Sequence, residues 1–258
     1  MSAELLEPER AAPVGAAAEH AASRRHGDIA YVSLWTPDVE RAAAFFAAVL
    51  GWRYAPSEHA RGRQVEGVTP RHGLWGGQQR GTLFCCFTVD DLTAAAERVR
   101  RAGGQAGEPS AEPYGRVSDC VDDQGMPFAL VQSPDGGSGR ANGGHGAHGA
   151  PGNLAYVVFE VRDSSAARAF YGAVLGWRYS PGGADDGWNV EGVTPMTGLH
   201  GGHERATVVP MYRVADIAAA VDRVRGAGGT ATDPQRRPYG LEASCADDQG
   251  TRFYLGQL

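Results

Sequence analysis

The chain contains the same sequence twice, at a constant offset of 125 positions. GDIAYV at 27–32 returns as GNLAYV at 152–157, and the hexapeptide VEGVTP occurs unchanged in both copies. When the copies are aligned without gaps, about half of the positions are identical. Repetition of this length and order indicates a duplicated domain. We therefore predict one domain at 27–132 and a second at 152–258.

The segments outside the two copies differ from them in composition. Residues 133–151 are rich in glycine and cannot form a core, which predicts a flexible linker. The first 26 residues mix acidic residues with alanine and lack the apolar stretch of a secretory signal, so we predict a disordered tail for 1–26. No apolar run approaches the length of about 20 residues that a membrane span needs. We expect a cytoplasmic protein with no membrane partner.

Charge and residue usage exclude several classes of function. The chain has 24 Lys and Arg residues against 30 Asp and Glu residues, a net charge of −6. An acidic chain repels a phosphate backbone, so we expect no nucleic-acid partner. All 24 cationic residues are arginine. Without lysine, the chain cannot form a Schiff base, anchor pyridoxal phosphate or build a P-loop.

Within each copy, the hydrophobic pattern changes from strand-like to helix-like twice. In the first copy, IAYVSLW alternates as a strand does, and Asp38 precedes a helical pattern that ends at Gly51. The pattern restarts with the strand-like TLFCCFTV, followed by Asp90, Asp91 and a second helical segment. Each copy therefore reads β-α-β-β-β twice. This order predicts an α+β fold in which two modules form a curved mixed sheet, with the helices outside.

Paired βαβββ modules with an Asp-capped helix, the pattern A-x-x-F-[FY] and then LGW resemble the vicinal oxygen chelate superfamily. This group includes glyoxalase I, bleomycin-resistance proteins and extradiol dioxygenases. The residues that carry the resemblance are Asp38, Phe45, Phe46 and 50–52 in the first copy, and Asp163, Phe170, Tyr171 and 175–177 in the second. The ending D-D-Q-G-x-x-F-x-L-x-Q of each copy is similar to the superfamily's terminal motif. The resemblance implies two tandem glyoxalase-like domains with cup-shaped sheets, like actinobacterial proteins whose ligands are mostly natural products.

The positions of the superfamily's metal ligands hold unsuitable residues in both copies. Metal-dependent members use His, Gln or Glu at inward-facing strand positions. The resemblance assigns these positions to Tyr31, Phe84 and Ala129 in the first copy, and to Tyr156, Val209 and Tyr254 in the second. Phenylalanine, valine and alanine cannot coordinate a metal ion. We therefore expect no metal and no other cofactor; a site outside the family pattern, from Glu160 with His200 or His203, is the less favoured alternative.

Strand periodicity predicts which side chains share the concave face, or cup, of each sheet. The cup of the first copy (cup one) is expected to be aromatic and apolar, and that of the second copy (cup two) to carry ionisable groups. We predict that cup two performs the chemistry, with Glu160, Tyr156 and His200 or His203 as catalytic residues. The predicted ligand-binding residues are Tyr31, Trp35, Trp75, Phe84, Asp119, Trp188, Met211, Arg213 and Tyr254.

The catalytic assignments have structural alternatives. Glu160 suits a general base because an inward-facing carboxylate is shielded from water, but an ion pair with Arg213 would make it a structural residue. His200 and His203 are three positions apart in a predicted strand and should face opposite sides, so at most one of them enters cup two.

The other candidates are equally open. Asp119 is either an inward-facing acid or a hydrogen-bonded edge residue. The tyrosines and tryptophans are either ligand contacts or ordinary packing residues. His72, which aligns with Thr197, is expected in an exposed turn.

Two functions from different classes fit these features. The first is a metal-independent, lyase-type or isomerase-type enzyme that dehydrates, cyclises or isomerises an aromatic polyketide-like intermediate of natural-product biosynthesis by acid/base catalysis. The second is a binding protein of the bleomycin-resistance type that sequesters an aromatic metabolite and confers self-resistance to it. The difference in polarity between the cups favours the enzyme. In both cases the partner is an aromatic small molecule, and the chain is a monomer or a homodimer.

Overall fold

A computed structural model of the protein describes residues 25–57, 59–112, 114–133 and 149–258. Most of the predicted tail (1–26) and of the predicted linker (133–151) lies outside the described residues. The helices are α1 (Val39–Leu50), α2 (Leu92–Arg101), α3 (Ser164–Leu175) and α4 (Ile217–Gly226). None of the helices in these described ranges is long and apolar enough to cross a membrane.

Each repeat forms its own sheet of nine strands. The strands of the first sheet are β1 (Ile29–Trp35), β2 (Tyr54–Ala55), β3 (Gly62–Val65), β4 (Arg71–Trp75), β5 (Thr82–Thr88), β6 (Gln105–Ala106), β7 (Ser110–Glu112), β8 (Gly115–Val121) and β9 (Pro127–Gln132). Those of the second are β10 (Leu154–Glu160), β11 (Tyr179–Pro181), β12 (Gly187–Val190), β13 (Met196–His200), β14 (Thr207–Arg213), β15 (Thr230–Ala231), β16 (Gln235–Arg237), β17 (Gly240–Ala246) and β18 (Arg252–Gln257).

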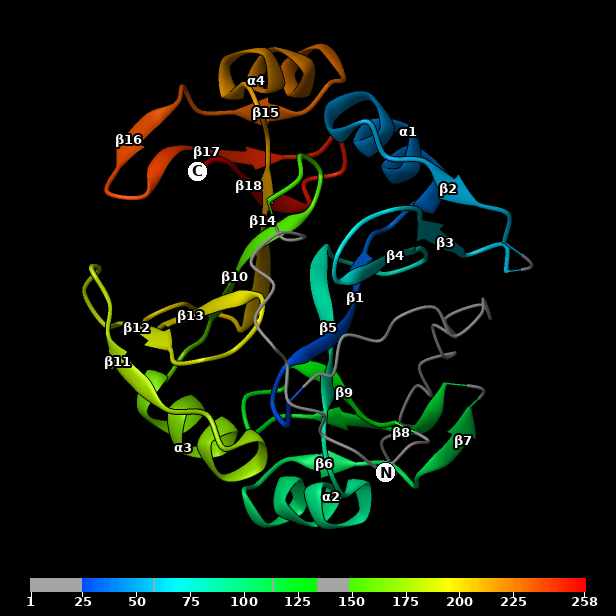
Figure 1. Ribbon diagram of the computed structural model, residues 1–258, viewed down its shortest axis with the longest axis vertical. Helices are drawn as coiled ribbons and strands as arrows, with labels where there is room; N and C mark the ends of the chain where they lie inside the picture. The colour runs from blue at the N-terminus through cyan, green and yellow to red at the C-terminus, as the bar shows by residue number, and fades with distance from the viewer. Residues whose placement is uncertain (1–24, 58, 113, 134–148) are drawn as a thin grey trace.

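The two sheets have the same strand order. The first runs β2-β3-β4-β1-β5-β9-β8-β6, with β7 paired to β8, and the second runs β11-β12-β13-β10-β14-β18-β17-β15, with β16 paired to β17. Pairing is mixed, because β1 is parallel to β4 and antiparallel to β5. Figure 1 shows both sheets curved, with their concave sides facing away from each other. The predicted α+β fold with curved mixed sheets is confirmed.

Local sequence signals explain where the helices begin and end. Asp38, Asp91, Asp163 and Asp216 are the N-caps, and each side chain accepts hydrogen bonds from backbone N–H groups of the first turn. Gly51 ends α1 with a φ of 72°, in the left-handed region that a residue with a Cβ enters only at a cost.

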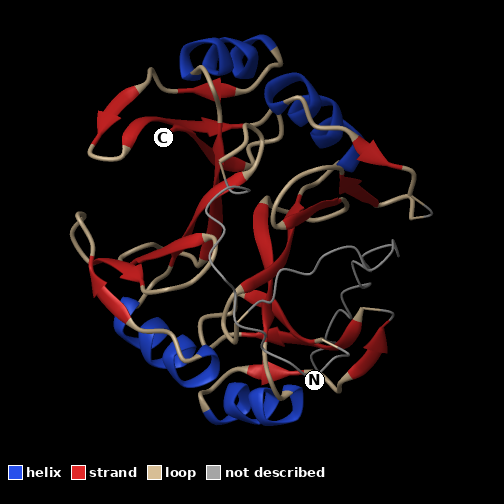
Figure 2. Cartoon of the chain, viewed as in Figure 1, coloured by secondary structure: helices blue, strands red, loops and turns tan. Residues whose placement is uncertain are grey.

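The helices pack in pairs that mix the two repeats. In Figure 2, α1 lies beside α4 at one end of the molecule, and α2 lies beside α3 at the other. The first pair covers an aromatic cluster in which Phe46 of α1 lies 5.3 Å from Phe253 and 6.0 Å from Tyr212, measured between ring centroids. Phe253 and Tyr212 belong to the second repeat. The apolar core is therefore shared between the repeats.

Reciprocal hydrogen bonds fix this arrangement. The Trp52 indole donates to the Gly152 carbonyl at 3.0 Å, and Trp177 donates to Gly27 at 2.9 Å, so each repeat anchors the start of the other's first strand. The tryptophan of each LGW motif is buried. Both indole N–H groups thus find a partner only in the other repeat.

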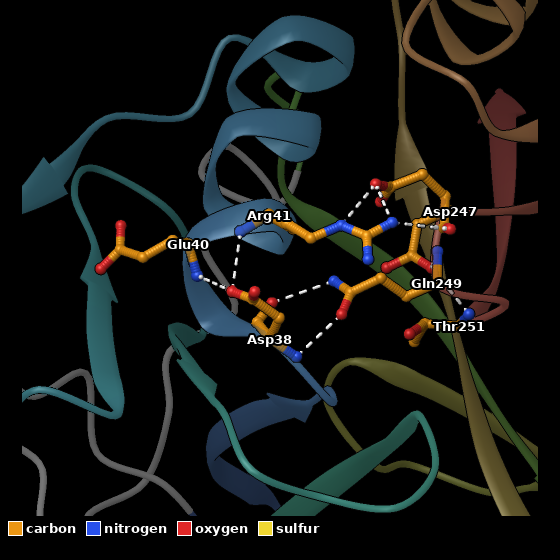
Figure 3. Close-up of polar contacts among 7 residues, drawn as sticks. Asp38, Glu40, Arg41, Asp247, Gln249 and Thr251 are labelled. Atoms are coloured by element: carbon orange, nitrogen blue, oxygen red, sulfur yellow. Dashed lines mark hydrogen bonds and ion pairs between the residues drawn. The ribbon is translucent and has the colours of Figure 1, made fainter.

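The D-D-Q-G turns dock in the same crossed manner. The Gln249 amide accepts from the backbone N–H of Asp38 at 2.7 Å and donates to the Asp38 carbonyl at 2.9 Å, next to the Arg41–Asp248 ion pair (Figure 3). Gln124 makes the equivalent bonds to Asp163. Each turn therefore holds the residue that caps the first helix of the other repeat.

His72 is buried in β4, and the expectation of an exposed turn is wrong. Its Nδ1 lies 2.9 Å from the Gly73 carbonyl and its Nε2 lies 2.8 Å from the Tyr212 hydroxyl, so the neutral ring donates to one and accepts from the other. Burial lowers the pKa of His72 to about 3. The sequence pattern missed this because the partner, Tyr212, belongs to the other repeat.

The shared core predicts that the two repeats unfold together. Phe46→Ala should lower the free energy of unfolding by about 3–5 kcal/mol, because the side chain is fully buried between the repeats. Urea unfolding followed by tryptophan fluorescence and by circular dichroism should give one coincident transition. Met196→Ala, at a position that is 61% exposed, is the control and should change stability by less than about 0.5 kcal/mol. Two separate transitions would contradict a shared core.

The neutral His72 predicts a loss of stability in acid. In the unfolded chain the imidazole has a pKa of about 6.5, so its contribution is complete above that pH and is lost as the pH falls toward the folded value of about 3. Between about pH 7.5 and pH 5 the loss should be about 2 kcal/mol. His72→Thr, which installs the residue of the second repeat, should remove this share of the pH dependence while the rest of the protein titrates as before. Equal pH dependence of the two proteins in urea titrations would contradict the assignment.

Candidate functional site

The concave face of the second sheet brings ionisable side chains together at the end of β10. Glu160 lies opposite His200 of β13 on one side and Thr207 of β14 on the other. Because residues two apart in a strand share a face, Tyr156 lies on the same side of the sheet as Glu160. The concave faces of β14 and β18 add Met211 and Tyr254 to cup two.

Glu160 is held by Arg252, the first residue of β18. The two guanidinium nitrogens Nη1 and Nη2 donate to the two carboxylate oxygens at 2.6 and 2.8 Å, and Glu160 is only 4% exposed. The alternative partner considered from the sequence, Arg213, is wrong: it donates to the Leu258 carbonyl. Since β14 is antiparallel to β10, Glu160 faces the start of β14, and Arg213 lies about 20 Å further along the strand.

His200 and His203 contact each other, so the expectation that at most one of them enters the cup is wrong. His200 Nδ1 and His203 Nε2 are 2.7 Å apart. The strand β13 ends at His200, and the turn through Gly201 and Gly202, which has a φ of 80°, brings His203 back beside it. Alternation of side chains holds only inside a strand, and here the strand has ended.

Glu160 completes a line of three residues. Its Oε2 lies 3.5 Å from His203 Nδ1, and His203 Nε2 in turn meets His200 Nδ1. We call this the Glu160–His203–His200 array. A carboxylate favours a proton on the facing nitrogen of His203. His203 Nε2 then accepts from His200 Nδ1, which leaves the second nitrogen of His200, Nε2, as a free base.

Two tyrosines of cup two supply hydroxyl groups. Burial and the nearby Glu160 charge raise the pKa of Tyr254, and burial raises the pKa of Tyr156, so both are protonated at neutral pH and can donate hydrogen bonds. The Tyr156 hydroxyl lies over Gly198 of the neighbouring strand, at the point where a Cβ would collide with it. A glycine is therefore required there for this position of the phenol.

Trp188 does not face cup two. It lies opposite Leu199 in β12, on the side of the sheet that packs against the core, and the Arg168 guanidinium of α3 covers its ring at 3.6 Å. Its indole donates to Asp186 at 3.2 Å. The sequence placed Trp188 in the cup because nothing in the sequence fixed the register of this short strand.

Cup one is lined by aromatic side chains that contact one another. Trp35 and Phe84 stack with their ring centroids 4.8 Å apart and their planes 9° from parallel. Trp75 lies beside Trp35 in the neighbouring strand and is buried. Tyr31 lies over Gly73 as Tyr156 lies over Gly198, and Asp119 lies opposite Ala129 at the other side of the cup.

The difference between the cups is concentrated at equivalent positions. Where cup two has Glu160, His200, His203 and Arg252, the first repeat has Trp35, Trp75, Gln78 and Pro127. Sequence reasoning missed Arg252, although its replacement of proline in the other copy was a visible signal. It also missed Glu242, which replaces Val117 of the first repeat. Glu242 forms an ion pair with Arg237 and accepts a hydrogen bond from the Tyr239 hydroxyl.

The strand registers also correct the positions considered for a metal. Tyr31 lies level with Cys86 and Ala129 in cup one, and Tyr156 lies level with Met211 and Tyr254 in cup two, so Phe84 and Val209 are two residues out of line. In cup one Ala129 offers no ligand, which leaves one thiol and one protonated phenol. In cup two, protonated phenols beside a thioether are poor ligands for a divalent ion. The residues present therefore do not fit the family's metal. In the described part of the chain, no group of three or more His, Cys, Asp or Glu side chains is arranged to hold a metal ion.

Two family models match the chain. The model of the Glyoxalase/Bleomycin resistance protein/Dioxygenase superfamily matches residues 28–136, and that of the Glyoxalase-like domain matches residues 156–256. Together they span both repeats. The chain therefore belongs to the glyoxalase, bleomycin-resistance and dioxygenase superfamily, as the order of its motifs indicated.

Individual proteins are similar over nearly the whole length. Anthracycline biosynthesis protein DnrV of Streptomyces peucetius is 27% identical, over 90% of this chain and 94% of that protein. The structure of the 2,3-dioxygenase LapB from Pseudomonas sp. KL28 superimposes with a TM-score of 0.68 at 14% identity, over 92% of this chain and 93% of that chain. The Mn(II)-bound glyoxalase from Novosphingobium aromaticivorans gives a TM-score of 0.66 at 17% identity, over 90% and 82%. At these identities, the solved structures establish the fold alone.

The Glu160–Arg252 pair predicts a specific pattern of stability. Arg252→Leu should lower the free energy of unfolding by about 2–3 kcal/mol, because it leaves a buried carboxylate without its partner. The double variant Glu160→Gln/Arg252→Leu should lose less, since the glutamine carries no charge. Urea titrations at neutral pH measure both values. A double variant at least as unstable as the single one would contradict this account of the pair.

Proposed function

We propose that the protein catalyses a metal-independent acid/base step in the biosynthesis of an aromatic polyketide, with cup two as its active site. The similarity to an anthracycline biosynthesis protein over the full length supports the biosynthetic role, because anthracyclines are aromatic polyketides. The observation that carries the chemistry is the Glu160–His203–His200 array, whose last nitrogen, His200 Nε2, has no hydrogen-bond partner among the described residues. The reactions that suit it are dehydration, cyclisation and isomerisation.

The array can take a proton from a carbon next to a carbonyl group. His200 Nε2 accepts the proton, and the hydrogen bond from His200 Nδ1 to His203 Nε2 spreads the positive charge toward Glu160. Glu160 acts through His203 and, since Arg252 occupies both of its oxygens, is a positioning residue in this proposal. A general base of this kind contributes a factor of about 10²–10⁴ to the rate.

The phenols of cup two can stabilise the charge that develops on the substrate oxygen. Tyr156 or Tyr254 donates a hydrogen bond to the carbonyl oxygen as it becomes an enolate. Met211, which lies level with both tyrosines, provides an apolar contact for the ring system of an aromatic substrate. In this proposal cup one binds ligand or serves as scaffold through Trp35, Trp75 and Phe84.

The competing proposal is sequestration of an aromatic metabolite without turnover. It is supported by the metal positions, which hold residues unsuited to the usual reactions of the superfamily. It predicts that the ligand returns unchanged from the protein. The array gives sequestration no evident advantage, because binding needs no free base, and we therefore favour the enzyme.

The test is the conversion of aromatic polyketide intermediates by metal-stripped protein, followed by mass analysis. A product lighter by one water, or a new isomer of unchanged mass, is expected. His203→Gln, which installs the residue found at this position of the first repeat, should lower kcat about 100-fold and leave binding of the intermediate within about twofold. Gln78→Ala in cup one is the matched control and should keep full activity. An unchanged kcat in His203→Gln would contradict the array, and recovery of every compound unchanged would favour sequestration.

A further inference from the structure

A cavity of about 260 Å³ lies where the two repeats meet, beside Arg252. Its lining comes from four places: the residue before the N-cap of α1, the loop before β5, the start of β14, and the turn that leads into β18. The lining includes Pro37, Gln79 and Arg80 of the first repeat, and Val208, Val209 and Arg252 of the second. Of these residues, the proposed chemistry of cup two uses only Arg252, which holds Glu160.

The polar part of the lining is positively charged. Arg80 and Arg252 both line the cavity, and among the described residues that line it there is no carboxylate. Arg80 makes no hydrogen bond or ion pair with another described residue. Arg252 gives two of its five N–H donors to Glu160 and also shares a hydrogen bond with Tyr254, which still leaves donors for a further acceptor. An anionic group in the cavity would therefore meet two guanidinium groups.

The rest of the lining is apolar or uncharged. Pro37, Val208 and Val209 provide apolar surface, while Gln79 and Thr207 add neutral polar groups. A bare inorganic anion would leave the apolar walls unused. The chemistry that fits both parts is a carboxylate on a small apolar body.

The cavity walls are fixed by the docking of the two repeats. Gln249, also part of the lining, is bonded at both ends of its amide to Asp38, the residue after Pro37 (Figure 3). The Thr82 hydroxyl accepts from the backbone N–H of Val208 at 3.1 Å. The cavity is therefore preformed, which lowers the entropy lost when a ligand binds.

The equivalent positions of the other repeat lack this charge pattern. Glu204 stands where the cavity has Gln79, and Pro127 stands where it has Arg252. Of the two arginines, only Arg80 has an arginine counterpart, Arg205. The pairing of two guanidinium groups without an acid thus belongs to one side of the molecule.

We propose that this cavity is a second ligand site, which binds a small carboxylate through Arg80 and Arg252 and packs its apolar body against Pro37, Val208 and Val209. The site goes beyond the proposed reaction in cup two. It adjoins the array through Arg252, which pairs with Glu160, and through Thr207, which lies opposite Glu160 in β14. Its occupancy can be measured independently of turnover.

Benzoate, titrated calorimetrically into the full chain at low ionic strength, tests the proposal. Arg80→Ala should weaken benzoate binding at least about tenfold, because it removes one of two charge-assisted contacts. Gln79→Glu, which installs the acid of the second repeat, should weaken binding to a similar extent through its own pairing with Arg80. Arg205→Ala is the matched control and should bind as the unmodified protein does.

Two further arms separate the alternatives. His203→Gln, which disables the array, should bind benzoate normally, so failure of this site and failure of the proposed reaction are distinguishable. Inorganic phosphate should bind more weakly than benzoate, because it leaves the apolar walls unused. No benzoate binding to the unmodified protein, or equal binding to Arg80→Ala, would overturn the site, and phosphate binding as tight as benzoate would overturn its assignment to carboxylates.

Discussion

The crossed docking of the D-D-Q-G turns is the constraint on which the rest of this structure depends. Each turn presents a glutamine whose amide satisfies both backbone groups of the Asp that caps a helix in the other repeat. The LGW tryptophans add indole hydrogen bonds in the same crossed sense. Because these contacts bring α1 to α4 and α2 to α3, apolar side chains of each repeat are buried against the other, and the two repeats share one apolar core.

This constraint accounts for some of the residues that are identical in the two copies. Residues of the crossed contacts, such as Trp52 and Gln124, have identical counterparts in Trp177 and Gln249. The inner faces of the cups take no part in these crossed contacts, because the sheets turn their concave sides away from each other. The two cups can therefore differ on the same backbone fold. Cup one contains the stacked Trp35 and Phe84, whereas cup two contains a carboxylate, a guanidinium and two imidazoles.

The polar groups of cup two depend on one another. The buried carboxylate of Glu160 is stabilised because Arg252 donates hydrogen bonds to both of its oxygens. The same carboxylate orients the His203 ring, and His203 in turn orients the His200 ring. Arg252 also borders the inter-repeat cavity. One guanidinium thus connects the interior of cup two with the junction of the repeats.

The sequence alone determined the duplication, the order of helices and strands, the Asp caps, the superfamily and the contrast in polarity between the cups. These are local or repetitive signals: a cap is read from a few neighbouring residues, and strand periodicity from alternate ones. Tertiary structure decided that Glu160 pairs with Arg252 and not with Arg213, that His203 turns back to His200, that Trp188 faces the core and that His72 meets Tyr212. Each of these depends on strand register, on a turn after a strand or on contact between the repeats. Such relations are set by the packing of segments distant in sequence, and no local pattern of residues encodes them.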